Sequence, residues 1–291
     1  MACIEAKGLR KAFGSTVALH GLDLRVEQGR ILGLIGRNGA GKSTALNAIL
    51  GLTPYQGQLS VLGLDPWTER DRLMCDVSFI SDVAVLPRWM RVRQALDYVD
   101  GVHPNFDRDK AERFLAKTEI TRSGKIGQLS KGMITQLHLA LVMAIDARLL
   151  VLDEPTLGLD LIYRKTFYDN LLNDYFDGER TIVITTHQVE EIQHLVTDVA
   201  FIDRGRILLT CAMEDFERRF VELAVRPGQL AAARALNPLH ERQMFGRSLL
   251  LFDGAEPRQL AGLGETRIPG IAELFVALVG ADAGKHQGVA A

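Results

Sequence analysis

A glycine-rich segment, Gly36–Ser43, constrains the fold of this chain more than any other feature of its sequence. It follows the short apolar run Ile31–Ile35 and leads into Lys42–Leu50, in which apolar residues recur at helical spacing. The segment fits G-x-x-x-x-G-K-[ST], a pattern in which backbone N–H groups turn inward around a phosphate at the start of a helix. Lys42 then supplies charge to the outer phosphates, and the Ser43 hydroxyl is placed to bind Mg²⁺. The sequence therefore predicts a buried strand, a phosphate-binding loop and a helix in succession.

Four further apolar runs have the character of buried strands and are separated by amphipathic stretches. They are Val77–Ile80, Leu149–Leu152, Thr181–Thr185 and Val199–Ile202. Alternation of this kind predicts an α/β protein with a largely parallel central sheet. The opening of the chain differs, because its short strand-like runs are separated by glycine turns, and this indicates an antiparallel patch beside the main sheet. These runs are Ile4–Ala6, Val17–Val26 and Gly57–Leu62.

Two later regions break the alternation. Residues 82–146 contain helical patterns, such as Arg91–Val99 and Lys110–Lys117, but no strand-like run, so we predict a helical subdomain inserted in the α/β core. Beyond about Cys211 the pattern changes to weak strands and short helices, and we expect a small α+β appendage, with its glycine-rich end after Gly280 frayed. The expected elements are strands at Val221–Val225 and Leu249–Phe252 and helices at Gln229–Leu236 and Ile271–Val279. The chain is thus divided into residues 1–210 and an appendage, 211–291, of unknown role.

Composition limits the classes of protein to which the chain can belong. With 47% hydrophobic and 24% charged residues it matches an ordinary globular protein. The 34 Lys and Arg against 36 Asp and Glu leave a net charge of −2, so no bulk positive field attracts phosphate backbones or anionic lipid. Three widely separated cysteines, Cys3, Cys75 and Cys211, favour a reducing compartment and indicate no zinc site. The longest apolar-looking stretch, Leu137–Leu152, is interrupted by polar residues, so we expect no membrane span.

Two carboxylates follow the apolar run Leu149–Leu152, at the edge of the sheet where open α/β folds bind ligands. Asp153 is the natural partner of Mg²⁺, directly or through water, and Glu154 is the natural group to polarise the attacking water. An apolar run followed by Asp-Glu is, taken alone, more often a plain strand end. The phosphate-binding loop in the same chain reverses that preference. Pro155, which lacks a donor N–H, then ends the strand.

The segment Leu129–Met133 admits two interpretations. Ser130 is a suitable N-cap for a helix that runs to about Asp146. Lys131 and Gly132, however, are unfavourable in a first helical turn, where a cation costs up to about 1 kcal/mol and glycine about another 1 kcal/mol relative to alanine. Both residues suit a first turn that faces an anion. The residues alone leave a helix cap and an anion site as equal alternatives.

The chain resembles the ATP-binding subunits of ABC transporters over about residues 4–210, because four segments occur in that family's order and spacing. They are GRNGAGKST, LSKGM, LLVLDEPTLGLD and a lone histidine, His187, after the strand TIVITT. The resemblance implies a P-loop NTPase fold, with a RecA-like core, an antiparallel β subdomain and an inserted helical subdomain, in agreement with the pattern above. It also implies ATP and Mg²⁺ as ligands.

The resemblance assigns the segment LSKGM to the signature motif, which in this family binds the γ-phosphate of the nucleotide held by the opposite subunit. Ser130 and Gly132 match the usual serine and second glycine of that motif. Lys131 and Met133 depart from the commoner glycine and glutamine. All four are expected to contact a second subunit's nucleotide.

Other positions receive roles in the same way. Asp160 corresponds to the D-loop, which crosses the dimer interface, and His187 to the switch histidine that contacts the γ-phosphate. With Lys42 and Glu154, His187 completes the expected catalytic set. Phe13 corresponds to the aromatic residue that stacks on adenine. The expected nucleotide-binding residues are Phe13, Gly36, Asn38, Gly39, Ala40, Gly41, Lys42, Ser43 and Thr44.

One position departs from the family pattern, at the end of the strand that enters the helical subdomain. The family usually has a glutamine there, which touches Mg²⁺ or the water and relays the nucleotide state to the membrane partner. Alignment places Asp82 at this position. A carboxylate can coordinate Mg²⁺ but donates no hydrogen bond unless it is protonated. We therefore expect Ser43, Asp153 and Asp82 as metal ligands, with altered coupling at this site.

The resemblance implies an ATP-hydrolysing motor subunit that dimerises around two ATP·Mg²⁺ with an identical or paralogous subunit. It would drive a separate membrane permease from the cytoplasmic face of the membrane, in the manner of the ABC-2-type exporter group. A permease helix is expected to dock near residues 82–92, where Pro87, Trp89 and Met90 are apolar, although packing within the helical subdomain explains these three residues equally well. No nucleic acid partner is expected.

Two other functions remain open. A soluble ABC ATPase acting on nucleic acid or the ribosome would use the same motor, but the single cassette and the net charge of −2 disfavour it. A catalytically impaired regulatory subunit is the second alternative. The presence of Glu154 and His187 argues against it, while Asp82 and the altered signature motif favour it.

Overall fold

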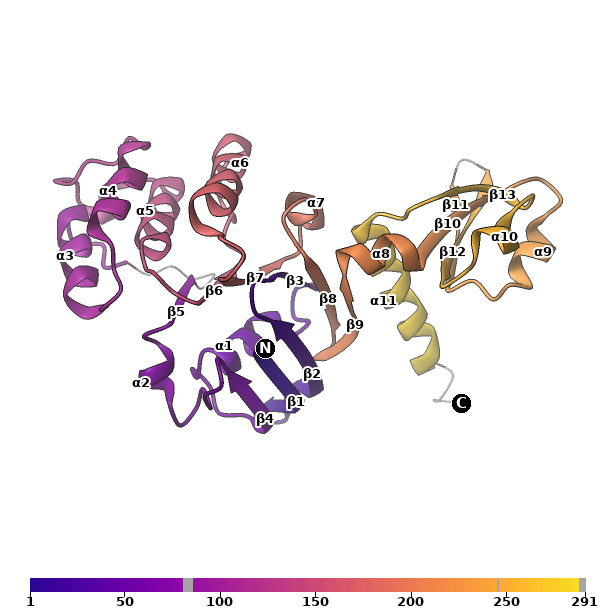
Figure 1. The fold of residues 1–291 in the computed structure, drawn as a ribbon, viewed down its shortest axis with the longest axis horizontal. Coiled ribbons are helices and arrows are strands. Elements are labelled where there is room, and N and C mark those ends of the chain that lie inside the picture. Colours follow the sequence, from indigo (N-terminus) through magenta and orange to yellow (C-terminus); the bar gives the residue numbers. More distant parts are fainter. Residues whose placement is uncertain (81–85, 245, 288–291) are drawn as a thin grey trace.

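The computed structural model describes the chain except residues 81–85, 245 and 288–291. Its centre is a six-stranded sheet in the order β5-β6-β7-β3-β8-β9 (Figure 1). The first five strands are parallel, and β9 pairs antiparallel with β8. The predicted largely parallel sheet is confirmed, and each of the five expected apolar runs contributes one strand. The strands are β3 (Ile31–Ile35), β5 (Val77–Ile80), β6 (Leu149–Asp153), β7 (Thr181–Thr186), β8 (Asp198–Asp203) and β9 (Arg206–Ala212).

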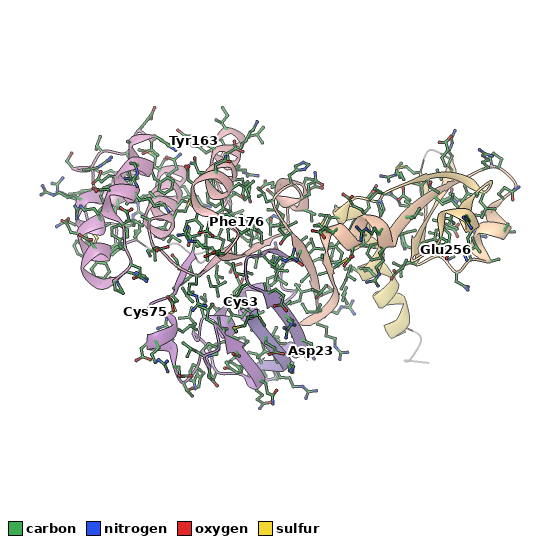
Figure 2. All side chains as sticks on the ribbon, in the orientation of Figure 1. Cys3, Asp23, Cys75, Tyr163, Phe176 and Glu256 are labelled. Carbon is green, nitrogen blue, oxygen red and sulfur yellow. The ribbon has the colours of Figure 1, made fainter. Side chains whose placement is uncertain are left out.

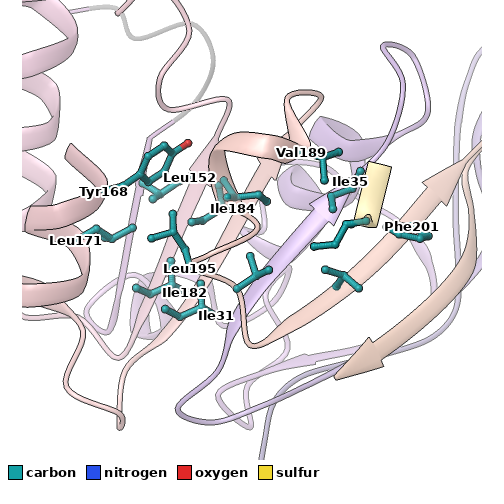
Figure 3. Packing of buried hydrophobic residues seen from close by; sticks show 14 of the residues in the cluster. Ile31, Ile35, Leu152, Tyr168, Leu171, Ile182, Ile184, Val189, Leu195 and Phe201 are labelled. Carbon is teal, nitrogen blue, oxygen red and sulfur yellow. The ribbon is translucent and has the colours of Figure 1, made fainter. Parts of the chain in front are cut away.

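Both faces of this sheet are covered, which is why its strands are continuous apolar runs. Alternate strand residues, such as Leu152 and Ile184, pack in one hydrophobic cluster with Tyr168 and Leu171 (Figure 3). The intervening residues face the opposite way and pack with α1 (Lys42–Ile49) and the antiparallel sheet. The helical segments that contribute to the first cluster include α6 (Leu161–Asn170), a π-helical turn (Leu171–Tyr175) and α7 (Val189–Ile192).

The opening of the chain forms a three-stranded antiparallel sheet in the order β2-β1-β4. β1 (Ala2–Phe13) and β2 (Thr16–Glu27) form a hairpin, and β4 (Gln56–Val61) pairs with β1. A short helix, α2 (Arg70–Leu73), follows. The predicted antiparallel patch is confirmed. Its strands are longer than the apolar runs indicated, because buried and exposed residues alternate along much of their length.

Between β5 and β6 the described residues form helices joined by turns and no named strand, as predicted. The helices bury a small core of their own, which includes Leu96, Leu115 and Leu137. Figure 1 shows them as a group at one end of the central sheet. They are α3 (Val92–Val102), α4 (Arg108–Ala116), a 3₁₀ turn (Ile126–Gln128) and α5 (Lys131–Met143).

A second antiparallel sheet, in the order β11-β12-β10-β13, lies in the C-terminal part of the chain. The predicted strands became β10 and β12, whereas β11 and β13 were not predicted. These two are edge strands with mostly polar, incompletely buried residues, so no apolar alternation marks them. The elements after β9 are α8 (Met213–Arg219), β10 (Phe220–Val225), α9 (Leu230–Arg234), β11 (His240–Met244), β12 (Arg247–Asp253), α10 (Pro257–Leu260), β13 (Gly264–Arg267) and α11 (Ile271–Gln287).

The last helix, α11, joins the C-terminal part to the central sheet. It continues to Gln287, so the expectation that the chain frays after Gly280 is wrong as far as Gln287, and residues 288–291 lie outside the described residues. Alanines in this stretch are strong helix formers and offset the cost of its glycines. The Phe275 ring meets Phe201 of β8 edge-on, with 5.4 Å between ring centres, and Leu274 is buried in the same cluster. The division into residues 1–210 and 211–291 remains a proposal, since the two parts share this cluster.

None of the helices in the part of the chain that the structure describes has the length and apolar character of a membrane span.

A network of four charged side chains ties α11 to the C-terminal sheet. Glu222 of β10 is only 3% exposed and accepts hydrogen bonds from Arg242 and Arg267, each at 2.8 Å. The same guanidinium groups donate to Glu273 in α11 at 2.6 Å, and the backbone N–H of Gly270 donates to it at 2.8 Å. Burial by itself raises the pKa of Glu273, but these donors outweigh it and lower the pKa to about 2.

Because the pKa of Glu273 is lowered, the free energy of unfolding of the chain depends on pH in the acidic range. We expect Glu273→Gln to lower the free energy of unfolding by about 1–2 kcal/mol at neutral pH, with allowance for the partial exposure of the groups. The folded-state pKa lies below the ordinary value of 4.5, so the carboxylate contributes fully above about pH 4.5 and its contribution is lost as the pH falls toward 2. Denaturant titrations of both proteins across this range measure the effect. A difference that stays constant down to about pH 2 would contradict it.

Candidate nucleotide site

The phosphate-binding loop connects β3 to α1, and two of its glycines allow close backbone contacts. A Cβ atom at Gly36 would lie 2.5 Å from the carbonyl oxygen of Ile202, and one at Gly41 would lie 2.9 Å from that of Ala18. Gly41 also has a φ of +105°, which L side chains rarely adopt. No side chain caps α1, which begins at Lys42. The N–H groups of its first turn are therefore available to an anion.

A pocket of about 500 Å³ lies at this loop, bordered by the start of α1 and by the residues that follow β6 and β7. It brings together predicted residues from three distant segments of the chain. Ala18, Arg37 and Leu157 also line it, although none of them was among the expected site residues. The lining residues are Ala18, Arg37, Asn38, Gly39, Gly41, Lys42, Ser43, Thr44, Glu154, Leu157 and His187.

Three expected nucleotide residues do not line this pocket. The Gly36 carbonyl accepts a hydrogen bond from Lys42 Nζ at 2.8 Å, and Ala40 is buried beneath the loop. Phe13 lies at the tip of the β1–β2 hairpin with 55% of its surface exposed. The Lys11 ammonium lies 4.8 Å from the centre of its ring. An exposed aromatic face is thus present for stacking.

The two carboxylates after β6 have different surroundings. Asp153 is buried and accepts a hydrogen bond from the Thr185 hydroxyl at 2.5 Å. Glu154 has a φ of +49°, which is unusual for a residue with a side chain, and its N–H donates to the Thr185 carbonyl at 3.2 Å. Such backbone strain costs about 1–3 kcal/mol and tends to occur at functional sites. Nothing in the sequence indicated this conformation.

Glu154 meets the other two predicted catalytic residues. Its Oε2 lies 2.9 Å from His187 Nδ1, and its Oε1 lies 3.4 Å from Lys42 Nζ. Lys42 is 6% exposed, so this ion pair is largely shielded from solvent. Glu154 Oε1 is buried and lacks a hydrogen-bond partner among the described residues, because the Lys42 contact is not aligned as a hydrogen bond. A buried acceptor of this kind has room for a further donor, such as a water molecule.

The expected metal ligands fit Mg²⁺ in type. Asp153 supplies a carboxylate and Ser43 a hydroxyl, and both are the oxygen ligands that Mg²⁺ prefers. Among the described residues no three His, Cys, Asp or Glu side chains form a metal-binding group. That finding suits a site completed by phosphate oxygens, which is the usual arrangement for Mg²⁺. Asp82, the third expected ligand, lies outside the described residues.

The signature residues do not line the phosphate pocket. Ser130 caps α5, because its hydroxyl accepts a hydrogen bond from the Met133 N–H at 3.2 Å. Lys131 is exposed, and its side chain passes close to Gly158, where an added Cβ atom would lie 3.0 Å from Lys131 Cε. The cap predicted for Ser130 is confirmed. The anion-binding role of Lys131 and Gly132 stays a prediction.

Asp160 begins α6 at the end of the loop after β6. Its carboxylate accepts hydrogen bonds from the N–H groups of Ile162 and Tyr163, each at 3.0 Å. Leu161 and Ile162 are 81% and 76% exposed. Figure 2 places Tyr163 at the outer surface of the molecule. The D-loop candidate therefore ends in an exposed apolar turn.

The fold and this pocket define a P-loop nucleotide-binding protein with a carboxylate and a histidine close to the lysine of its glycine-rich loop. Residues 19–157 match the family model described as ABC transporter. The chain is 31% identical over 247 residues to the daunorubicin resistance ATP-binding protein DrrA3 of Streptomyces coeruleorubidus, a match that covers 81% of this chain and 78% of that protein. It is 32% identical over 271 residues to the Nod factor export ATP-binding protein I of Cupriavidus pinatubonensis, covering 86% and 80%.

Solved structures of ATP-binding subunits of ABC transporters share the fold of this chain. One titled as the ATP-binding subunit of an ABC transporter superposes with a TM-score of 0.67 at 22% identity, over 74% of this chain and 92% of that one. A nucleotide-free ATP-binding cassette from an ABC transporter superposes with a TM-score of 0.62 at 19% identity, over 75% and 94%. The chain belongs to the family of ATP-binding subunits of ABC transporters. The predicted P-loop NTPase fold and family are both confirmed.

Proposed function

We propose that this chain hydrolyses ATP and thereby drives a separate membrane permease. The observation that carries the proposal is the position of Glu154, whose two carboxylate oxygens face Lys42 and His187. Lys42 belongs to the phosphate-binding loop, so a terminal phosphate held there would lie next to the carboxylate. A carboxylate with one buried, incompletely bonded oxygen is suited to orient an attacking water.

In the proposed reaction, Lys42 and the N–H groups at the start of α1 hold the β- and γ-phosphates. The phosphate oxygens compete with Glu154 for the Lys42 ammonium and leave Glu154 Oε1 free to accept a hydrogen bond from water. His187 holds Oε2 and fixes the direction of the carboxylate. When Mg²⁺ is bound at Asp153 and Ser43, it neutralises charge on the phosphates.

We further propose that two such subunits, identical or paralogous, enclose two ATP·Mg²⁺. The signature residues support this arrangement, because Lys131 is exposed and does not line its own chain's phosphate pocket. A cation and the start of α5 facing a second subunit's γ-phosphate would clamp its charge from both sides. The exposed Leu161 and Ile162 offer apolar surface to the same second subunit.

The names of the relatives support a membrane partner and a location at the membrane. DrrA3 is named as a resistance ATP-binding protein and the Nod factor protein as an export ATP-binding protein. We place this chain with them in the ABC-2-type exporter group, at the cytoplasmic face of the membrane. Trp89, 72% exposed beside the helical subdomain, is the expected contact for a permease helix, whereas Met90 packs against that subdomain's core.

The other two functions have less support. A nucleic acid partner is disfavoured by the net charge of −2, which provides no basic surface in excess. A regulatory subunit with an impaired site is disfavoured by the intact contacts among Lys42, Glu154 and His187.

Phosphate release and cell fractionation test the proposal together. We expect the purified chain to release phosphate from ATP with Mg²⁺ and to stop when EDTA removes the metal. Co-expressed with the membrane protein of a neighbouring gene, it should fractionate with membranes, and nuclease treatment should leave that distribution unchanged. Turnover that persists in EDTA, or co-fractionation with RNA in place of membrane, would contradict the proposal.

A further inference from the structure

Arg164, in the first turn of α6, joins the loops that follow two different strands. Its Nε donates a hydrogen bond at 2.8 Å to the carbonyl of Leu159, in the loop after β6. Its Nη1 donates to Gln188 Oε1 at 2.7 Å and pairs with Glu191. Gln188 and Glu191 both lie after β7. The Arg164 guanidinium therefore links the loop after β6 to the segment after β7.

Glu191 completes a ring of contacts. Its second oxygen accepts a hydrogen bond from the Thr156 hydroxyl at 2.9 Å, and Thr156 lies two residues after Glu154. Thr156 is buried, and its hydroxyl is also 3.3 Å from that of Tyr168. The Arg164 and Glu191 side chains are 25% and 18% exposed. We name this set of contacts, from Thr156 through Glu191 and Arg164 to Leu159, the Arg164 ring.

The Arg164 ring constrains the part of the site where the chemistry is proposed to occur. The loop after β6 carries Glu154 and the loop after β7 carries His187, and their 2.9 Å contact depends on how the two loops are placed. A half-buried ion pair whose members also make neutral hydrogen bonds holds one geometry in preference to others. The phosphate-binding loop takes no part in the ring.

We propose that Arg164 is a positioning residue for ATP hydrolysis, an inference that rests on the proposed function. It holds the loops after β6 and β7 so that His187 stays in contact with Glu154. It does so without touching the nucleotide. Lysine at this position has a single ammonium and cannot reproduce the fork that reaches the Leu159 carbonyl and the residues after β7.

Steady-state kinetics of Arg164 variants test the inference. We expect Arg164→Ala to lower kcat for MgATP about 10- to 100-fold, because displacement of a reacting group by about 1 Å has effects of this size. KM for ATP should stay within about threefold, since Lys42 and its loop are unchanged. Arg164→Lys should recover part of the lost kcat. Glu191→Gln keeps one acceptor oxygen for Arg164, and its amide N–H can donate to the Thr156 hydroxyl, but it loses the charge, so its kcat should lie between those of wild type and Arg164→Ala.

Arg180→Ala is a matched control. Arg180 is similarly buried, at 23% exposed, pairs with Asp146 and donates to the Tyr175 carbonyl at 2.7 Å. It precedes β7, at the opposite end of that strand from His187. We expect Arg180→Ala and Arg164→Ala to lower the melting temperature comparably, and Arg180→Ala to leave kcat within about twofold.

Each result separates two possibilities. If Arg164→Ala lowers kcat no more than Arg180→Ala does, Arg164 is merely structural and the inference is overturned. If Arg164→Ala does not fold, Arg164→Lys and Glu191→Gln carry the same kcat and KM comparison. If wild type releases no phosphate, or Glu154→Gln turns over at the wild-type rate, the proposed function fails and this inference fails with it.

Discussion

Replacing Glu154 with glutamine is expected to lower the MgATP turnover rate at least about 100-fold while leaving ATP affinity within a few-fold. The amide has the size of the carboxylate and can still bond to His187, so the geometry of the site is preserved. It has no negative charge and polarises water weakly. Phosphate release at saturating ATP, with ATP binding measured separately, gives both quantities.

With MgATP, two Glu154→Gln chains should stay together as a dimer, because the bound ATP is no longer hydrolysed. Cys75 is exposed while Cys3 and Cys211 are buried, so a spin label at Cys75 reports the separation of two chains (Figure 2). Cys75 precedes β5, away from the carboxyl edge of the sheet that carries the nucleotide residues. We expect a defined inter-label distance with MgATP and its loss with ADP.

Glu190→Gln provides the control for this experiment. Glu190 is exposed in α7, three residues after His187, and undergoes the same chemical change outside the pocket. Its turnover rate should match wild type. A Glu154→Gln protein that hydrolyses ATP normally contradicts the catalytic role. One that is inactive but stays monomeric with MgATP contradicts a dimer of identical chains.

The sequence predicted the central sheet closely because parallel strands covered on both faces have a simple signature. All the residues of β6 and β7 are buried, and their apolar runs match the strands to within one or two residues. Edge strands have no such signature. β11 and β13 present polar residues to solvent, and only pairing with β12 and β10 makes them strands. Their prediction would have required knowledge of the tertiary contacts.

The residues of the candidate site also divide into those that the sequence predicted and those that it could not predict. Lys42, Glu154 and His187 were predictable, because each directly follows a buried strand or a glycine loop and carboxyl strand ends meet at one edge of the sheet. The Arg164 ring has no local pattern, since Arg164 and Glu191 are 27 residues apart and meet only when the segments after β6 and β7 come together in the folded chain. The left-handed backbone of Glu154 was also invisible, because glutamate has no preference for it.

Removing the ammonium of Lys42 is expected to have the second large effect, on binding and turnover together. Lys42 is buried and is the cation nearest to the incompletely bonded oxygen of Glu154. We expect Lys42→Ala to weaken MgATP binding about 10- to 100-fold, the value of one charge-assisted hydrogen bond, and to abolish measurable turnover. Titration with a fluorescent ATP analogue and phosphate release measure the two effects.

Thermal unfolding distinguishes lost binding from lost folding in this variant. A ligand at 100 times its Kd stabilises the folded chain by about 2.7 kcal/mol, so MgATP should raise the melting temperature of wild type but hardly that of Lys42→Ala at the same concentration. Lys7→Ala, at an exposed position of β1 where Lys7 pairs with Glu5, should keep the full MgATP shift. Without nucleotide, Lys42→Ala removes the cation that faces the buried Glu154 oxygen, and its melting temperature should fall below that of Lys7→Ala. A Lys42→Ala protein with the wild-type MgATP shift and turnover would show that the phosphate is held elsewhere.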